Sequence, residues 1–229
     1  MDAWTTSSTE AAERISAFLW KVYGWMAVGL GLTAVVAFVV AGSPEILSVL
    51  VGNRLVFFGL ILAELGLVFF LSARAGSLAP STASGLFVVY SGLNGATLSV
   101  VLLAYTGESV ATTFLITAGM FGALALFGST TKRSLAGAGQ FFMMGLVGLI
   151  LASIVGVFWH NDALQFLISV VGVIVFTGLT AYDAQRLKQM ALALPGGEAG
   201  SYAIVGALSL YLDFINLFLM LLRFTGRRD

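Results

Sequence analysis

The chain has 229 residues, of which 59% are hydrophobic and 10% are charged, and its mean hydropathy is +1.01. A soluble domain usually carries about 25% charged residues, so this composition excludes a water-soluble protein and makes lipid the solvent. The net charge is zero and no cysteine is present, which argues against a nucleic-acid partner and excludes disulfides and thiolate chemistry.

Seven apolar runs are each long enough to cross a bilayer, which takes roughly 20 mostly apolar residues per helix. They cover residues about 20–41, 54–72, 81–104, 109–128, 139–158, 163–183 and 202–223. The breaks between them carry glycine, proline or charged residues, and none is long enough to fold by itself. The sequence therefore predicts an all-α polytopic membrane protein with a single transmembrane helical domain over residues 1–229.

The N-terminal end is expected to combine a polar tail with an uncleaved first helix. Residues 1–14 are polar and are expected to form a frayed tail or an interfacial turn. The first apolar run is too long for the apolar part of a signal peptide. His160, the single histidine, is expected in a loop beside Trp159 as an interfacial residue rather than a metal ligand.

Basic residues between the runs indicate the orientation, because cytoplasmic loops carry an excess of Lys and Arg. Seven crossings place seven basic residues on the side of the N-terminus, namely Arg14, Lys21, Arg74, Lys132, Arg133, Arg186 and Lys188. The other side holds Arg54, Arg223, Arg227 and Arg228. This excess predicts a cytoplasmic N-terminus. The arginines after the last run fit the far side poorly, so a last segment that re-enters instead of crossing stays open as the alternative.

Three carboxylates fall inside the apolar runs. Glu64 lies at the middle of the second run, Asp183 ends the sixth, and Asp213 lies near the middle of the seventh. A charged group at membrane depth is costly, roughly 2.5–3.5 kcal/mol on insertion scales, so such residues usually face a bundle interior or a watery cavity. We therefore expect all three to face inward, and Glu64 in particular to avoid lipid.

A polar stripe marks the last predicted helix. Gly206, Ser209, Asp213 and Asn216 follow one another at intervals of 3, 4 and 3, which places them on one helix face. Helical rise puts Asp183 about 5–8 Å and Asp213 about 10 Å below the cytoplasmic interface, so the two carboxylates can meet. In one low-dielectric site they would share a proton and titrate jointly. The alternative is that each carboxylate bonds separately within the bundle.

The segments around these aspartates carry a family resemblance. Residues Phe176 to Arg186 and Ala207 to Phe218 resemble the Bax inhibitor-1 family, the transmembrane Bax inhibitor motif group, as found in bacteria. The resemblance covers nearly the whole chain, from the first helix to Arg223. It implies six helices in antiparallel pairs around a central C-terminal seventh, and a pH-sensitive calcium leak in the inner membrane. The family's paired aspartates correspond to Asp183 and Asp213.

The resemblance also implies roles for other residues. The acid of the family's second helix corresponds to Glu64, and a basic residue at the end of that helix to Arg74. We therefore expect a pH-sensing ion path made of Asp183, Asp213, Glu64, Arg74 and Asn216. The two aspartates would also be the calcium ligands, because hard cations prefer oxygen.

Three functions follow from this pattern. The leading one is a calcium-permeable leak channel without enzymatic activity or cofactor, whose partners are the lipid bilayer and the calcium ion. The second is a non-conducting regulator of a membrane protease or stress pathway. The third, an intramembrane aspartyl protease, is the least favoured: Tyr182-Asp183 fits such enzymes, but the segment before Asp213 lacks their glycines and no Pro-Ala-Leu motif follows.

Overall fold

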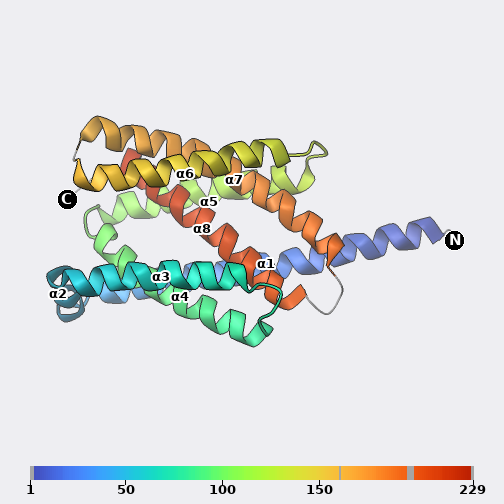
Figure 1. Ribbon diagram of the computed structural model, residues 1–229, viewed down its shortest axis with the longest axis horizontal. Helices are drawn as coiled ribbons and strands as arrows, with labels where there is room; N and C mark the ends of the chain where they lie inside the picture. The colour runs from blue at the N-terminus through green and yellow to red at the C-terminus, as the bar shows by residue number, and fades with distance from the viewer. Residues whose placement is uncertain (1–2, 160, 195–198, 228–229) are drawn as a thin grey trace. The chain divides into compact units, whose positions relative to one another are not determined.

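The computed structural model describes residues 3–159, 161–194 and 199–227, and His160 lies outside them. Over these residues the chain is all-helical, with eight α-helices and no strand (Figure 1). They are α1 (Ala3–Ala41), α2 (Pro44–Gly52), α3 (Arg54–Ala73), α4 (Pro80–Leu102), α5 (Gly107–Thr130), α6 (Ala136–Phe158), α7 (Asp162–Ala193) and α8 (Ala199–Thr225). All except α2 are long and apolar enough to cross a membrane. The predicted all-α class and the predicted number of seven spans are confirmed.

The predicted end of the sixth span was wrong. Asp183 does not end a helix, because α7 continues to Ala193. Beyond Asp183, the residues Ala184, Leu187 and Ala191 are buried, at helical spacing, whereas Arg186 is exposed. This segment is an amphipathic continuation of the helix, which packs by one face although its charges lower its hydropathy.

The N-terminal part differs from the prediction in two ways. The polar segment expected to be frayed or turned is helical from Ala3 onward, continuous with the first span. The short helix α2 was not predicted, because its nine residues are too few to stand out as a span. Pro44 begins α2, at a position where its missing N–H costs nothing.

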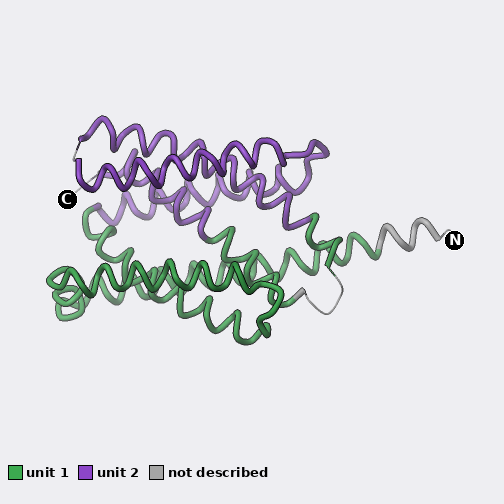
Figure 2. Tube along the Cα trace, viewed as in Figure 1, with its two compact units in different colours: residues 1–104, 189–211 green, residues 105–188, 212–229 purple. Residues whose placement is uncertain are grey.

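The chain divides into two compact units (Figure 2). Unit 1 holds Met1–Ala104 with Gln189–Tyr211, and unit 2 holds Tyr105–Lys188 with Leu212–Asp229. Helix α8 begins in unit 1 and ends in unit 2. It is the most buried of the seven spans, with 67% of its apolar stretch buried against 39% or less in the others. This is the burial expected of the predicted central C-terminal helix.

In unit 1, α4 packs against both α1 and α3, and α2 contacts α1 and α3. Helices α1 and α4 approach closely at Gly95, where an added Cβ would lie 2.7 Å from the backbone oxygen of Thr33. At one end of this unit, the Arg14 guanidinium donates to the carbonyl of Leu194 at 2.7 Å. The Ser201 hydroxyl donates to the carbonyl of Ala75 at 2.6 Å, which fixes the start of α8 beside the end of α3.

In unit 2, the core joins α6, α7 and the second half of α8. Its buried members are Leu149, Ile168, Val175, Phe176, Leu179, Leu217 and Leu221. The backbone N–H of Thr106 donates to the carbonyl of Arg227 at 3.1 Å, so the end of α8 lies beside the start of α5. Seven alternating crossings place these two points on the same side, which favours complete crossing by α8 over re-entry. The orientation of the N-terminus stays a prediction.

Candidate functional site

Two buried carboxylates belong to unit 2. Asp183 of α7 is 9% exposed and Asp213 of α8 is 6% exposed. The two lie within range of mutual electrostatic repulsion. The Oδ2 atom of Asp213 is buried without a hydrogen-bond partner among the described residues. A buried oxygen of this kind is costly, because it has lost water and gained no donor. The structure thus brings the predicted pair together in one unit, and the shared proton stays a prediction.

The polar residues expected beside the aspartates bond to their own helices. The Thr180 hydroxyl donates to the carbonyl of Phe176 at 2.8 Å, and the Asn216 amide donates to the carbonyl of Leu212 at 2.8 Å. Asn216 is only half-buried. The burial of α8 is not confined to its polar stripe, because Leu208, Leu210, Leu217 and Leu222 are also almost completely buried.

Gln185, which the sequence reasoning did not single out, anchors α7 two residues after Asp183. Its side chain is 7% exposed. Its Nε2 donates to the carbonyl of Arg133 at 2.8 Å, and its Oε1 accepts from the N–H of Leu135 at 2.8 Å. One turn further, Lys188 Nζ donates to the carbonyl of Ser129 at 2.7 Å. These bonds hold α7 against the α5–α6 loop and fix the turn that carries Asp183.

A third buried carboxylate lies in unit 1. Glu64 of α3 is 9% exposed, so the prediction that it faces the protein interior is confirmed. Its Oε2 lies 3.0 Å from the side-chain amide of Asn94, and its Oε1 accepts a hydrogen bond from the hydroxyl of Thr97. Both partners lie on α4, so α4 shields this acid from lipid.

The Glu64 contacts continue into α8 and α1. The other polar atom of the Asn94 side chain lies 2.9 Å from the hydroxyl of Tyr211, which is fully buried. That hydroxyl lies 2.7 Å from Oγ1 of Thr33, which in turn lies 2.9 Å from the carbonyl oxygen of Ser91. Four helices of unit 1 therefore meet in one line of hydrogen bonds, none of which was predicted.

Arg74 stands apart from the Glu64 site. It is exposed and caps the C-terminal end of α3, with its guanidinium 5.8 Å from the centre of the Phe70 ring. Glu64 lies ten residues earlier on the same helix (74 − 64 = 10), a separation of about 15 Å along the axis. The structure does not bring Arg74 together with Glu64.

The residues that the structure describes contain no group of three or more His, Asp or Glu side chains able to hold a metal ion. The predicted calcium ligands are therefore the carboxylates of Asp183 and Asp213 alone. A resident calcium ion takes roughly six to eight oxygen ligands. The two carboxylates alone offer fewer oxygens than that.

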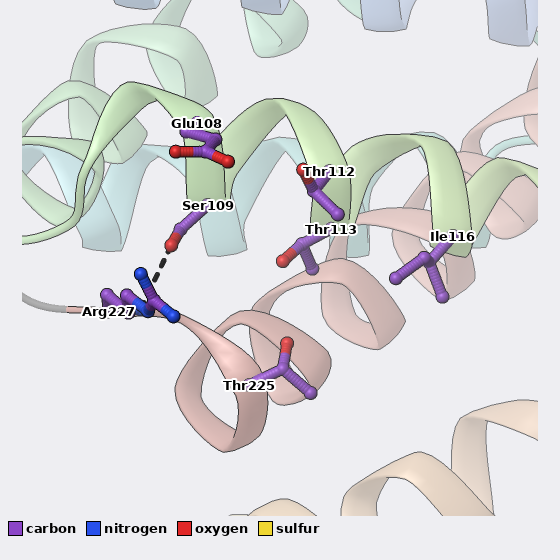
Figure 3. A pocket seen from close by; sticks show the side chains of 7 residues that line it. All are labelled: Glu108, Ser109, Thr112, Thr113, Ile116, Thr225 and Arg227. Atoms are coloured by element: carbon purple, nitrogen blue, oxygen red, sulfur yellow. Dashed lines mark hydrogen bonds between the residues drawn. The ribbon is translucent and has the colours of Figure 1, made fainter.

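Unit 2 also has an open pocket of about 210 Å³ between the start of α5 and the end of α8 (Figure 3). It is lined by Glu108, Ser109, Thr112, Thr113, Ile116, Thr225 and Arg227. The N–H of Arg227 donates to Ser109 Oγ at 3.0 Å. Thr225 follows Asp213 by twelve residues (225 − 213 = 12), about 18 Å along α8, so the pocket is separate from the aspartate pair.

Comparison with known proteins agrees with this architecture. A family model described as "Inhibitor of apoptosis-promoting Bax1" matches residues 15–229. The chain is 48% identical over 217 residues to the inner membrane protein YbhL of Escherichia coli K12, covering 93% of each. It is 42% identical over 218 residues to an uncharacterized protein of Deinococcus radiodurans, covering 95% of this chain and 93% of that one. It is 36% identical over 223 residues to an uncharacterized membrane protein of Streptococcus pyogenes serotype M1, covering 96% of this chain and 97% of that one.

Proposed function

Because the chain belongs to the Bax inhibitor-1 family, we propose that this integral membrane protein is a pH-sensitive, calcium-permeable leak of the bacterial inner membrane. The Asp183 and Asp213 pair is its proton switch. One observation carries the proposal: Asp213 is buried with an unpartnered oxygen and within electrostatic range of a second buried carboxylate.

The physical basis is the cost of two like charges in a medium of low dielectric. With one proton between them, the carboxylates carry a single charge and a hydrogen bond can link α7 to α8. Without that proton they repel one another and attract a hard cation. The state of the α7–α8 contact therefore follows the proton, and we expect this contact to change with pH.

The test is calcium entry into proteoliposomes that hold an internal calcium indicator, measured from pH 5 to 8. The variants are Asp183→Asn, Asp213→Asn and the double change. Each single change should flatten the pH dependence, and the double change should add little, because the pair acts as one unit. Asp162→Asn is the matched control, since it removes an exposed carboxylate from the start of α7.

The outcomes separate the alternatives. If both single variants keep the wild-type pH profile, the aspartate switch is wrong. If folded wild-type protein gives no calcium flux at any pH, the leak is wrong, and the chain acts instead as a non-conducting regulator of a membrane protease or stress pathway. Peptide cleavage by the same liposomes would point to an aspartyl protease.

A further inference from the structure

The line of hydrogen bonds in unit 1 restricts where hydrogen atoms can lie. Its four contacts join Glu64 Oε2 to the Asn94 amide (3.0 Å), that amide to the Tyr211 hydroxyl (2.9 Å), this hydroxyl to Thr33 Oγ1 (2.7 Å), and Thr33 Oγ1 to the carbonyl oxygen of Ser91 (2.9 Å). Each contact needs one hydrogen between its two heavy atoms. A hydroxyl supplies one hydrogen, whereas an amide supplies hydrogens only from its nitrogen.

The hydrogens can be assigned from the Ser91 end. A carbonyl only accepts, so the Thr33 hydroxyl donates to Ser91 and must accept from Tyr211. Tyr211 has then used its one hydrogen and must accept from Asn94. The amide nitrogen of Asn94 therefore faces Tyr211 and its oxygen faces Glu64, which is the reverse of the orientation in which Nδ2 lies 3.0 Å from Glu64 Oε2 and Oδ1 lies 2.9 Å from the Tyr211 hydroxyl. Which amide atom is nitrogen is settled by such bonding, not by the positions of the heavy atoms.

The last contact then needs a hydrogen that only Glu64 can supply. We infer that Glu64 is a proton-binding site, whose bound proton completes one directed chain of hydrogen bonds from α3 through α4 and α8 to α1. The inference does not depend on whether the protein conducts calcium.

An ionised Glu64 leaves the chain one hydrogen short. The carboxylate would turn the amide nitrogen of Asn94 toward itself and its oxygen toward Tyr211. Tyr211 would then donate to Asn94. The Thr33 hydroxyl has one hydrogen, so it could donate to Tyr211 or to the carbonyl of Ser91 but not to both. Two buried acceptors would face each other across 2.7 or 2.9 Å. Three contacts would compete for two hydroxyl hydrogens.

The other groups around Glu64 do not remove this shortage. Thr97 donates to the second carboxylate oxygen, Oε1, and can do so whether or not Oε2 carries a proton. Among the described residues, the titratable groups within electrostatic range of Glu64 are Tyr90 of α4 and Tyr211 of α8. Neither tyrosine can carry a positive charge that would balance an ionised Glu64. No Lys or Arg of the described part of the chain pairs with Glu64, so the bound proton is what neutralises it.

The proton state of Glu64 is thereby transmitted along the chain. Loss of the proton would turn the Asn94 amide over and redirect the hydroxyl of Tyr211 on α8. It would also break one of the two contacts of Thr33 on α1. A single proton on α3 thus sets hydrogen-bond directions on three other helices of unit 1.

Infrared difference spectroscopy of the purified protein tests this inference, because a protonated carboxylic acid has its own carbonyl band. Wild type and Glu64→Gln are compared at pH 7. We expect a band in wild type that is missing in Glu64→Gln. The glutamine N–H replaces the acid O–H, so this variant should also keep the wild-type melting temperature or exceed it. Bands from other acids are common to both proteins and cancel.

Tyr211→Phe tests the chain itself, with Tyr90→Phe as the matched control. Tyr90 stacks edge-on against Tyr211 with ring centres 5.7 Å apart, but its hydroxyl is not part of the chain. Without the Tyr211 hydroxyl the Asn94 amide is free to turn, so the Glu64 band should disappear at a lower pH than in wild type. In Tyr90→Phe the pH of disappearance should not change. Absence of a Glu64-dependent band in folded wild type, or an unchanged pH in Tyr211→Phe, would overturn the inference.

Discussion

Replacing Gln185 by leucine should destabilise the protein through two lost hydrogen bonds. Leucine has a similar volume and suits a side chain that is 7% exposed, so packing is largely kept. The carbonyl of Arg133 and the N–H of Leu135 would lose their partners at 2.8 Å. At about 1 kcal/mol for each partly buried group, the free energy of unfolding should fall by about 2 kcal/mol.

The assay is thermal unfolding in detergent, followed by the fluorescence of the four tryptophans. A loss of this size corresponds to a fall in melting temperature of about 4–8 °C for a chain of this length. Gln189→Leu is the control, because Gln189 lies one turn further along α7 and is exposed. Equal melting temperatures for the two variants would refute the anchoring role of Gln185.

Three further predictions concern packing, charge and topology. Gly128→Leu should abolish a monodisperse peak in size-exclusion chromatography, because an added Cβ would meet the backbone carbonyl of Ala181. Gly122→Leu on the same helix should keep that peak, because an added Cβ at Gly122 meets open space. At low ionic strength Glu108→Gln should lower calcium flux and Arg227→Gln should raise it, because these two opposite charges flank the α5–α8 pocket. Both effects should become smaller in high salt, which screens exposed charges. A reporter fused after Arg133 should be cytoplasmic, and an external signal would reverse the predicted orientation.

The spans were predictable because lipid imposes a simple requirement on sequence. Each crossing needs an uninterrupted apolar stretch, and the seven stretches stand out between charged or glycine-containing breaks. Hydropathy could not locate the end of α7. Residues 184–193 include Arg186 and Lys188, so they do not resemble a membrane span, although Leu187 and Ala191 are buried at helical spacing. Periodicity, not mean hydropathy, carries the signal there.

The sequence predicts the burial of single residues at the candidate sites, but not the hydrogen bonds that join them. The cost of a charge in lipid is enough to place Glu64 inside the protein. Its partners are polar residues that any helix could carry. Thr33 and Tyr211 are 178 residues apart in the chain, and their contact exists only because α1 and α8 pack in the same unit. The same reasoning explains why Gln185 was missed, since its partners lie on a loop 50 and 52 residues earlier.

Helix α8 contributes a residue to each of the two sites, Tyr211 to the Glu64 chain and Asp213 to the aspartate pair. Tyr211 and Asp213 are two residues apart, which turns their side chains about 200° from one another around the helix axis. Tyr211 belongs to the Glu64 chain in unit 1, whereas Asp213 belongs to unit 2, where Asp183 lies within electrostatic range of it. A buried polar group on a membrane-spanning helix needs protein around it, because lipid could not satisfy its hydrogen bonds. The extensive burial of α8 is thus a condition for placing both Tyr211 and Asp213 on one span, and not only a feature of its packing.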